Sequence, residues 1–257
     1  GGAVLTIAAT GSEMSNGSVI TNDENMLKRS FDSNYCQCKF AVMNPELTYT
    51  LPAYQTASGC VDIMMHTMER YFSVDSMALT DAMSEALLRV VLKYSRIVMS
   101  SPADYEARAT IMWAGSLSHN GLTGCGSIGD WAPHMIEHEL GGMFDVAHGA
   151  GLAAIWGSWA RYVLKVKPER FAQFAENVMG ISSGESAEET AIAGIEALEN
   201  FFRELHMPTN LRELGCEPTD AQIAELADKC CDGDTHTVGH FMPLKSSDVA
   251  AILTAAK

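Results

Sequence analysis

Residues 52–73, with the sequence PAYQTASGCVDIMMHTMERYFS, decide the fold of this chain. Pro52 stands where proline is favoured, in the first turn of a helix, and the apolar residues behind it recur at helical spacing. The same period continues to the C-terminus, and neither an internal repeat nor a low-complexity linker interrupts it. The sequence therefore predicts a mainly α-helical domain over residues 52–257.

Further helices are predicted from the same periodicity and from helix-breaking residues. The next covers 76–100, and Ser101-Pro102 ends it and starts another that runs to about Asn120. The others are expected at 131–143, 149–166, 168–179, 186–206, 219–230 and 246–256.

The first 51 residues have a different pattern. Short β-branched runs, VLTIAATGS, GSVIT and KFAVMNPELTYTLP, are separated by Gly, Asn and Pro, which is typical of strands and loops. A few strands cannot form an independent sheet without partners that bury their faces. Gly1-Gly2 stand directly before an apolar run. We therefore expect residues 1–51 to be the remnant of an N-terminal α/β domain, and the chain to be the C-terminal part of a longer protein.

Composition excludes several classes of function. The 257 residues include 17 Lys and Arg against 32 Asp and Glu, a formal charge of −15 that repels nucleic acids and anionic membrane surfaces. The sequence contains no apolar stretch of the ~18–20 residues that span a bilayer, and no basic segment of a signal peptide at its start. The seven cysteines are scattered and odd in number, which favours a reducing cytoplasm over a disulfide framework.

Two polar residues stand out in the deciding helix. Asp62 and His66 lie four positions apart in the apolar segment VDIMMHTM. That spacing places both side chains on one helix face, where two ligands can reach one ion. A hydrogen-bonded Asp–His pair without a metal explains the same spacing.

A second histidine-rich segment, HMIEHELGGMFDVAH, covers residues 134–148. His134 and His138 are four apart on a predicted helix, and His148 follows after a Gly-Gly break. Burying so many imidazoles without partners would cost several kcal/mol. A cation that binds neutral imidazoles and a carboxylate removes that cost. Together with Asp62 and His66, the segment therefore predicts a divalent metal site.

The same segment permits a different enzyme. His134-Met-Ile-Glu137-His138 fits the inverted H-x-x-E-H pattern of certain zinc peptidases, in which both histidines bind zinc and Glu137 would be the general base. This alternative leaves Asp62, His66 and His148 without a role. A third interpretation is a non-catalytic helical domain that binds a metal or a partner.

The chain resembles the iron-containing (group III) alcohol dehydrogenases, in particular their butanol dehydrogenase and NADPH-dependent aldehyde reductase branch. Five ordered segments carry the resemblance: VLTIAATGSEMS, FAVMNPELTYTLP, ASGCVDIMMHTMERYF, DWAPHMIEHELGG and DVAHGAGLA. The resemblance implies an all-helical metal-binding domain preceded by the last strands of a Rossmann-like α/β domain. The family's GGGS phosphate loop has no counterpart in this sequence.

The resemblance also implies roles for individual residues. Four side chains would hold the metal, namely Asp62, His66, His134 and His148. His138 would be a catalytic residue that lies beside the substrate and takes part in proton transfer, because imidazole titrates near neutral pH. Three residues of one turn and a lysine would contact the cofactor, namely Thr10, Gly11, Ser12 and Lys28. The alternatives for these four are ordinary turn chemistry and a solvated surface charge.

The activity that the resemblance implies is the interconversion of primary alcohols and aldehydes with NAD(P)H, in the cytoplasm. The ion, Fe²⁺ or Zn²⁺, would polarise the oxygen of a small alcohol or aldehyde, and the nicotinamide would carry the hydride. The resemblance allows a homodimer. Because most of the nucleotide-binding domain is missing, we expect this chain alone to have weak or no activity.

Overall fold

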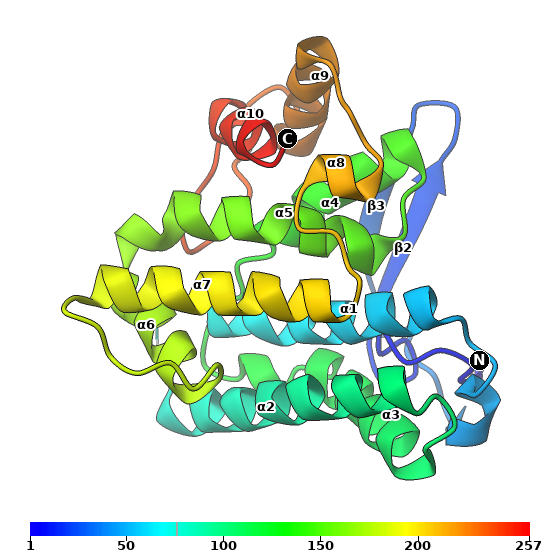
Figure 1. Ribbon diagram of the computed structural model, residues 1–257. Coiled ribbons are helices and arrows are strands. Elements are labelled where there is room, and N and C mark those ends of the chain that lie inside the picture. The colour runs from blue at the N-terminus through cyan, green and yellow to red at the C-terminus, as the bar shows by residue number, and fades with distance from the viewer. Residues whose placement is uncertain (76) are drawn as a thin grey trace.

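Most of the chain is helical in the computed structural model, which describes residues 1–75 and 77–257 (Figure 1). The α-helices of the described residues are α1 (Ala53–Tyr71), α2 (Ala78–Ser100), α3 (Tyr105–His119), α4 (Ala132–Phe144), α5 (His148–Val163), α6 (Pro168–Asn177), α7 (Ala187–Glu204), α8 (Leu211–Leu214), α9 (Asp220–Cys231) and α10 (Ser246–Ala255). Three short 3₁₀ helices are η1 (Pro45–Thr48), η2 (Leu122–Gly124) and η3 (Leu164–Val166). The prediction of a mainly α-helical chain is confirmed.

The strands of the described residues all precede α1 and form two small pairs. β1 (Ala3–Val4) pairs in parallel with β4 (Ala41–Val42), and β2 (Gly17–Asn22) pairs antiparallel with β3 (Leu27–Asp32). The hairpin β2–β3 stands at one end of the helical bundle beside α4 (Figure 1). Among the described residues, none of the α-helices is long and apolar enough to cross a membrane.

Helix α1 lies at the centre of the bundle, where it packs against α2, α3 and α5. Fifteen of its 19 residues are buried, so even its polar side chains lie in the interior. Just after its end, Phe72 stacks on Phe171 with ring centroids 4.3 Å apart, and both rings contact Trp159. A helix that is buried on all sides holds its side chains in fixed positions, which a metal site requires.

Several helix ends differ from the predicted ones. The predicted start of the second helix at Ser76 lies outside the described residues. Helix α3 begins at Tyr105 rather than at 102, because the Asp104 side chain accepts a hydrogen bond from the Ala107 N–H (2.8 Å) and caps the helix. Helix α8 was not predicted, because four residues are too few to show a helical period.

Helix α4 confirms the helix predicted over 131–143 and continues through Gly141 and Gly142 to Phe144, so the Gly-Gly pair does not break it. The two glycines instead leave room for the hairpin. A Cβ atom at 142 would lie 2.7 Å from the Met26 carbonyl oxygen, and one at 141 would lie 3.0 Å from Lys28 Nζ. The absence of side chains therefore brings β3 against the helix that carries two of the predicted site histidines.

The N-terminal strip also differs from its prediction in two places. The run VLTIAATGS is a strand only at its first residue, Val4, although the Leu5 N–H still donates to the Val42 carbonyl oxygen of β4 (3.0 Å). The segment Leu27–Asp32 was not predicted as a strand, because its charged residues hide the alternation. It becomes one because the short turn after Asn22 folds it back onto β2.

Candidate metal centre

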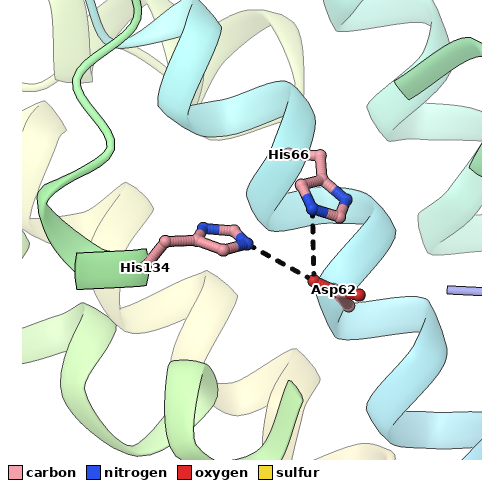
Figure 2. Close-up of side chains that lie close together, drawn as sticks. All are labelled: Asp62, His66 and His134. Carbon is pink, nitrogen blue, oxygen red and sulfur yellow. Dashed lines mark ion pairs between the residues drawn. The ribbon is translucent and has the colours of Figure 1, made fainter. Parts of the chain in front are cut away.

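Asp62 and His66 lie one turn apart on α1 and point to the same side of the helix, as the spacing predicted (Figure 2). The distance from Asp62 Oδ1 to His66 Nε2 is 3.6 Å, and both side chains are almost completely buried. Figure 2 also shows His134 of α4 directed at the same carboxylate, with its Nε2 3.5 Å from Asp62 Oδ1.

His148 reaches the same oxygen from a third helix. It is the first residue of α5, and its Nε2 lies 3.6 Å from Asp62 Oδ1. The neighbouring Gly149 makes this approach possible, because a Cβ atom there would clash with the backbone of Ser58 on α1. The structure therefore brings together the four residues predicted to bind metal, and Asp62 contacts each of the three histidines.

The distances in this cluster suit a metal ion. Four ligand atoms bound tetrahedrally at 2.0–2.2 Å lie about 3.3–3.6 Å from one another. The candidate ligand atoms of Asp62, His66 and His134 all lie within 4.8 Å of one another, and His148 joins them through its 3.6 Å distance to Asp62 Oδ1. Among the described residues, Asp62 Oδ1 and His134 Nε2 are buried without a hydrogen-bond partner. Buried polar atoms without partners are costly, and a cation bound between them would supply the missing interaction.

The electrostatics of the cluster favour positive charge at its centre. Burial by itself would raise the pKa of Asp62, but His66, His148 and His134 outweigh burial and hold that pKa far below its usual range. Burial would lower the pKa of His134, yet Glu69 and Asp62 raise it to about 10. The buried carboxylates therefore favour positive charge at this position, carried either by a proton on His134 or by a bound cation.

His138, the predicted catalytic residue, lies next to this cluster but does not contact Asp62. Its ring centroid is 5.6 Å from that of His148 and 6.2 Å from that of His134. It forms a second group of possible ligand atoms with His148 and Glu137. Burial lowers the pKa of His138 to about 2, and the nearby His134 and His148 contribute to the shift, so the imidazole is neutral.

The residues predicted to contact the cofactor lie on two segments near the cluster. Gly11 has a positive φ of 63° and packs on the end of α3, where a Cβ atom would lie 2.8 Å from the Gly115 carbonyl oxygen. Thr10 and Ser12, on either side of it, are exposed. Lys28 on β3 places its Nζ 3.5 Å from Glu137 Oε2. Its role toward a cofactor stays a prediction.

Four residues at the cluster were missed by the sequence reasoning or given another role. Glu69 contacts the Nδ1 of His134, and Glu137 contacts the Nδ1 of His148. His119 lies over His66 with ring centroids 4.1 Å apart, and Trp131 lies 5.3 Å from His134. Glu69 follows His66 by three positions on the same helix, which is the one signal that could have revealed it.

Glu137 is poorly placed for the role that the peptidase alternative gives it. Its side chain has no exposed surface, and its Oε2 is engaged by both His148 and Lys28. A general base must reach a water molecule beside the ion. The peptidase pattern also requires His134 and His138 to bind one zinc ion. In this structure His134 faces Asp62, whereas His138 groups with Glu137 and His148.

Comparison with known proteins points in one direction. The model of the Fe-containing alcohol dehydrogenase family, C-terminal part, matches residues 56–257. NADH-dependent butanol dehydrogenase A of Clostridium acetobutylicum is 38% identical over 251 residues, which cover 97% of this chain and 64% of the relative. The NADPH-dependent aldehyde reductase YqhD of Escherichia coli is 38% identical over 218 residues, which cover 84% of this chain and 56% of the relative.

The solved structures agree with the sequence relatives. The crystal structure of Escherichia coli YqhD superposes with a TM-score of 0.95 at 34% identity, over 100% of this chain and 65% of that one. The chain thus spans less than two thirds of the length of each of these proteins.

Proposed function

The chain belongs to the Fe-containing alcohol dehydrogenase family, and from this premise we propose that it is the metal-binding part of an enzyme that interconverts primary alcohols and aldehydes with NAD(P)H. The relatives support both halves of the proposal, since their names specify an NADH-dependent butanol dehydrogenase and an NADPH-dependent aldehyde reductase. Seven free cysteines are consistent with a reducing cytoplasm as the place of the reaction.

One observation carries the proposal: Asp62 Oδ1 lies 3.5–3.6 Å from the Nε2 atoms of three histidines on three different helices. Asp62, His66, His134 and His148 would hold the ion. Three imidazoles and one carboxylate accept Fe²⁺ as well as Zn²⁺. An ion held there would supply Lewis-acid polarisation of the oxygen of the alcohol or aldehyde.

The remaining roles follow from the surroundings of the ligands. We assign residues 52–257 to the metal-binding domain and residues 1–51 to the cofactor side, and the location of all described strands before Ala53 supports this division. His138 borders His148 without contacting Asp62, and we assign it to the substrate side of the ion, where its neutral imidazole would be a hydrogen-bond partner for the substrate. Thr10, Gly11, Ser12 and Lys28 would contact the nicotinamide cofactor, which carries the hydride.

Removal of the central carboxylate tests the metal site. We expect Asp62→Ala to weaken the binding of Zn²⁺ or Co²⁺ to this chain by at least about 100-fold, since loss of a group that only supports a ligand already costs about 10- to 100-fold. Isothermal titration of the metal-free protein measures the affinity. Asp248→Ala is the control, because Asp248 hydrogen-bonds Tyr162 and caps α10 instead of contacting a site histidine. Equal affinity in the wild type and Asp62→Ala would contradict the proposed site.

A chimera tests the reaction. The corresponding part of Escherichia coli YqhD is replaced by this chain, and NADPH oxidation is followed in the presence of butanal. We expect butanal-dependent activity that the Asp62→Ala chimera lacks. A chimera that binds metal and NADPH but reduces no aldehyde would favour the non-catalytic interpretation of the domain.

A further inference from the structure

Glu69 makes two contacts with one proposed ligand. Its Oε2 pairs with the Nδ1 of His134, and its Oε1 accepts a hydrogen bond from the backbone N–H of the same residue (2.9 Å). The Glu69 side chain is buried on α1 and belongs to a different helix from His134. The carboxylate therefore fixes both the start of α4 and the orientation of the imidazole that α4 carries.

Glu137 makes a comparable contact with a second proposed ligand. Its Oε2 pairs with the Nδ1 of His148 and lies 3.5 Å from Lys28 Nζ. The carboxylate occupies space that Gly151 of α5 leaves free, because a Cβ atom at 151 would lie 2.9 Å from Glu137 Oε1. The two helices are thus shaped to place this carboxylate behind the imidazole of His148.

The two contacts have the same chemical consequence. An imidazole that donates its Nδ1–H to a carboxylate keeps the lone pair on Nε2, and the negative charge behind the ring makes that nitrogen a stronger electron donor. In both histidines the Nε2 is the atom directed at Asp62, at 3.5 Å for His134 and 3.6 Å for His148. His66 differs, since its Nδ1 has no hydrogen-bond partner among the described residues.

The buried carboxylates at this place also favour a bound cation. Asp62, Glu69 and Glu137 bring three buried carboxylates to one place. Lys28 is the one lysine or arginine side chain within ion-pair distance of them in the described part of the chain. Buried carboxylates are stable only where opposite charges balance them, and a divalent cation bound by the imidazoles would supply such a charge.

We infer that Glu69 and Glu137 are positioning residues, which fix His134 and His148 in the tautomer and orientation that bind the metal. This inference rests on the proposed metal site and extends it to two residues that do not touch the ion. It also assigns to Glu137 a role different from that of a general base.

Glu→Gln substitutions test the inference because they keep the shape of the side chain. Glu69 accepts hydrogen bonds with both oxygens, so the amide in Glu69→Gln loses one of them in either orientation. The amide in Glu137→Gln can still offer its oxygen to His148 but loses the ion pair with Lys28. We therefore expect Glu69→Gln to weaken Co²⁺ and Zn²⁺ binding by about 10- to 100-fold, and Glu137→Gln to weaken it less, toward the lower end of that range.

The experiment is a competition titration of the metal-free chain against a chelator, followed by the visible absorption of bound Co²⁺. Glu199→Gln is the matched control, because Glu199 is a buried carboxylate that pairs with Arg161 and contacts no site histidine. We expect the control to match the wild type, and the two test variants to show shifted Co²⁺ bands at saturation. A variant that is merely less stable would keep the wild-type spectrum when folded and saturated.

The outcomes separate the two hypotheses. If the wild type binds no Co²⁺ or Zn²⁺, the proposed metal site is wrong. If the wild type binds and both Glu→Gln variants bind with the same affinity and spectrum, the positioning role is wrong. If either of these variants does not fold, Glu69→Asp and Glu137→Asp replace it, and wild-type affinity in both would likewise overturn the inference.

Discussion

The helix that carries Asp62 and the hairpin that carries Lys28 differ strongly in burial. Helix α1 buries 15 of its 19 residues, whereas the described strands β2 and β3 contain no fully buried residue. Ile20 and Phe31 on the hairpin are 66% and 61% exposed. The core of the helical domain therefore determines the positions of the proposed metal ligands, and the hairpin reaches them through a few polar contacts.

The largest expected effect is on stability, and it should differ between a buried phenylalanine beside α1 and an exposed one on the hairpin. Phe72 is completely buried beside α1 and stacks on Phe171, whereas Phe31 lies on the exposed hairpin. We expect Phe72→Ala to lower the free energy of unfolding by about 3–5 kcal/mol. Phe31→Ala should change it by less than about 0.5 kcal/mol. Urea denaturation measures the free energy of unfolding of both variants. Similar losses of stability would show that the hairpin and the helical core do not differ as proposed.

The next largest expected effect is on metal affinity, and it should differ between two histidines on the adjoining helices α4 and α5. His148 contacts Asp62 and His138 does not, although their rings are 5.6 Å apart. We expect His148→Ala to weaken metal binding by at least about 100-fold, as for the loss of a direct ligand. His138→Ala should leave the affinity nearly unchanged. Isothermal titration calorimetry with Zn²⁺ measures the affinity of both variants. An equal loss of affinity in the two would indicate that His138 also binds the metal.

A smaller effect should appear where the hairpin is attached to α4. Arg29 pairs with the buried Glu139 (2.5 Å) and donates to the Lys229 carbonyl oxygen of α9. Arg29→Met leaves a buried carboxylate without its partner, and we expect a loss of about 1–3 kcal/mol. Hydrogen exchange should increase in β2 and β3 and stay unchanged in α1.

The control for this variant is Arg96→Met, which removes an exposed ion pair with Glu204. It should change stability by less than about 0.5 kcal/mol. If exchange in α1 rises together with exchange in the hairpin of Arg29→Met, the two regions unfold as one unit and the contrast between them fails.

The smallest effect should come from Lys28. Its ammonium group lies behind Glu137, which itself contacts His148, and it is partly exposed. We expect Lys28→Met to strengthen metal binding by less than about tenfold, because a positive charge near the cation is removed and solvent screens part of its effect. Chelator competition detects the change, and weaker binding would show that Lys28 supports the site in another way.

The helices could be predicted because their apolar period extends over many turns. The pairs Asp62–His66 and His134–His138 were visible for the same reason, since a spacing of four residues has a defined meaning on a helix. The contact between α1, α4 and α5 was not visible, because the distance between two helices depends on packing that no local pattern encodes. The choice of ligands within the histidine-rich segment therefore came from the family resemblance.

Glu69 and His119 illustrate what local patterns omit. Glu69 stands near the end of α1 and looks like a solvent-facing residue, yet it is completely buried against His134. His119 is the last residue of α3 and joins the cluster only because α3 packs on α1. In both cases the neighbours are distant in sequence, so the burial of the side chain could not be read from the chain alone.

Gly149 sets the spacing between the helices that carry three of the proposed ligands, although it has no coordinating atom itself. Because it has no side chain, α5 crosses α1 at backbone contact, and His148 stands at the crossing point. A methyl group at 149 would act as a spacer that moves the histidine outward and enlarges the space between the donors. The preference for ion size would then be adjustable from a position without any coordinating atom, and a library at residue 149 could screen for larger metals.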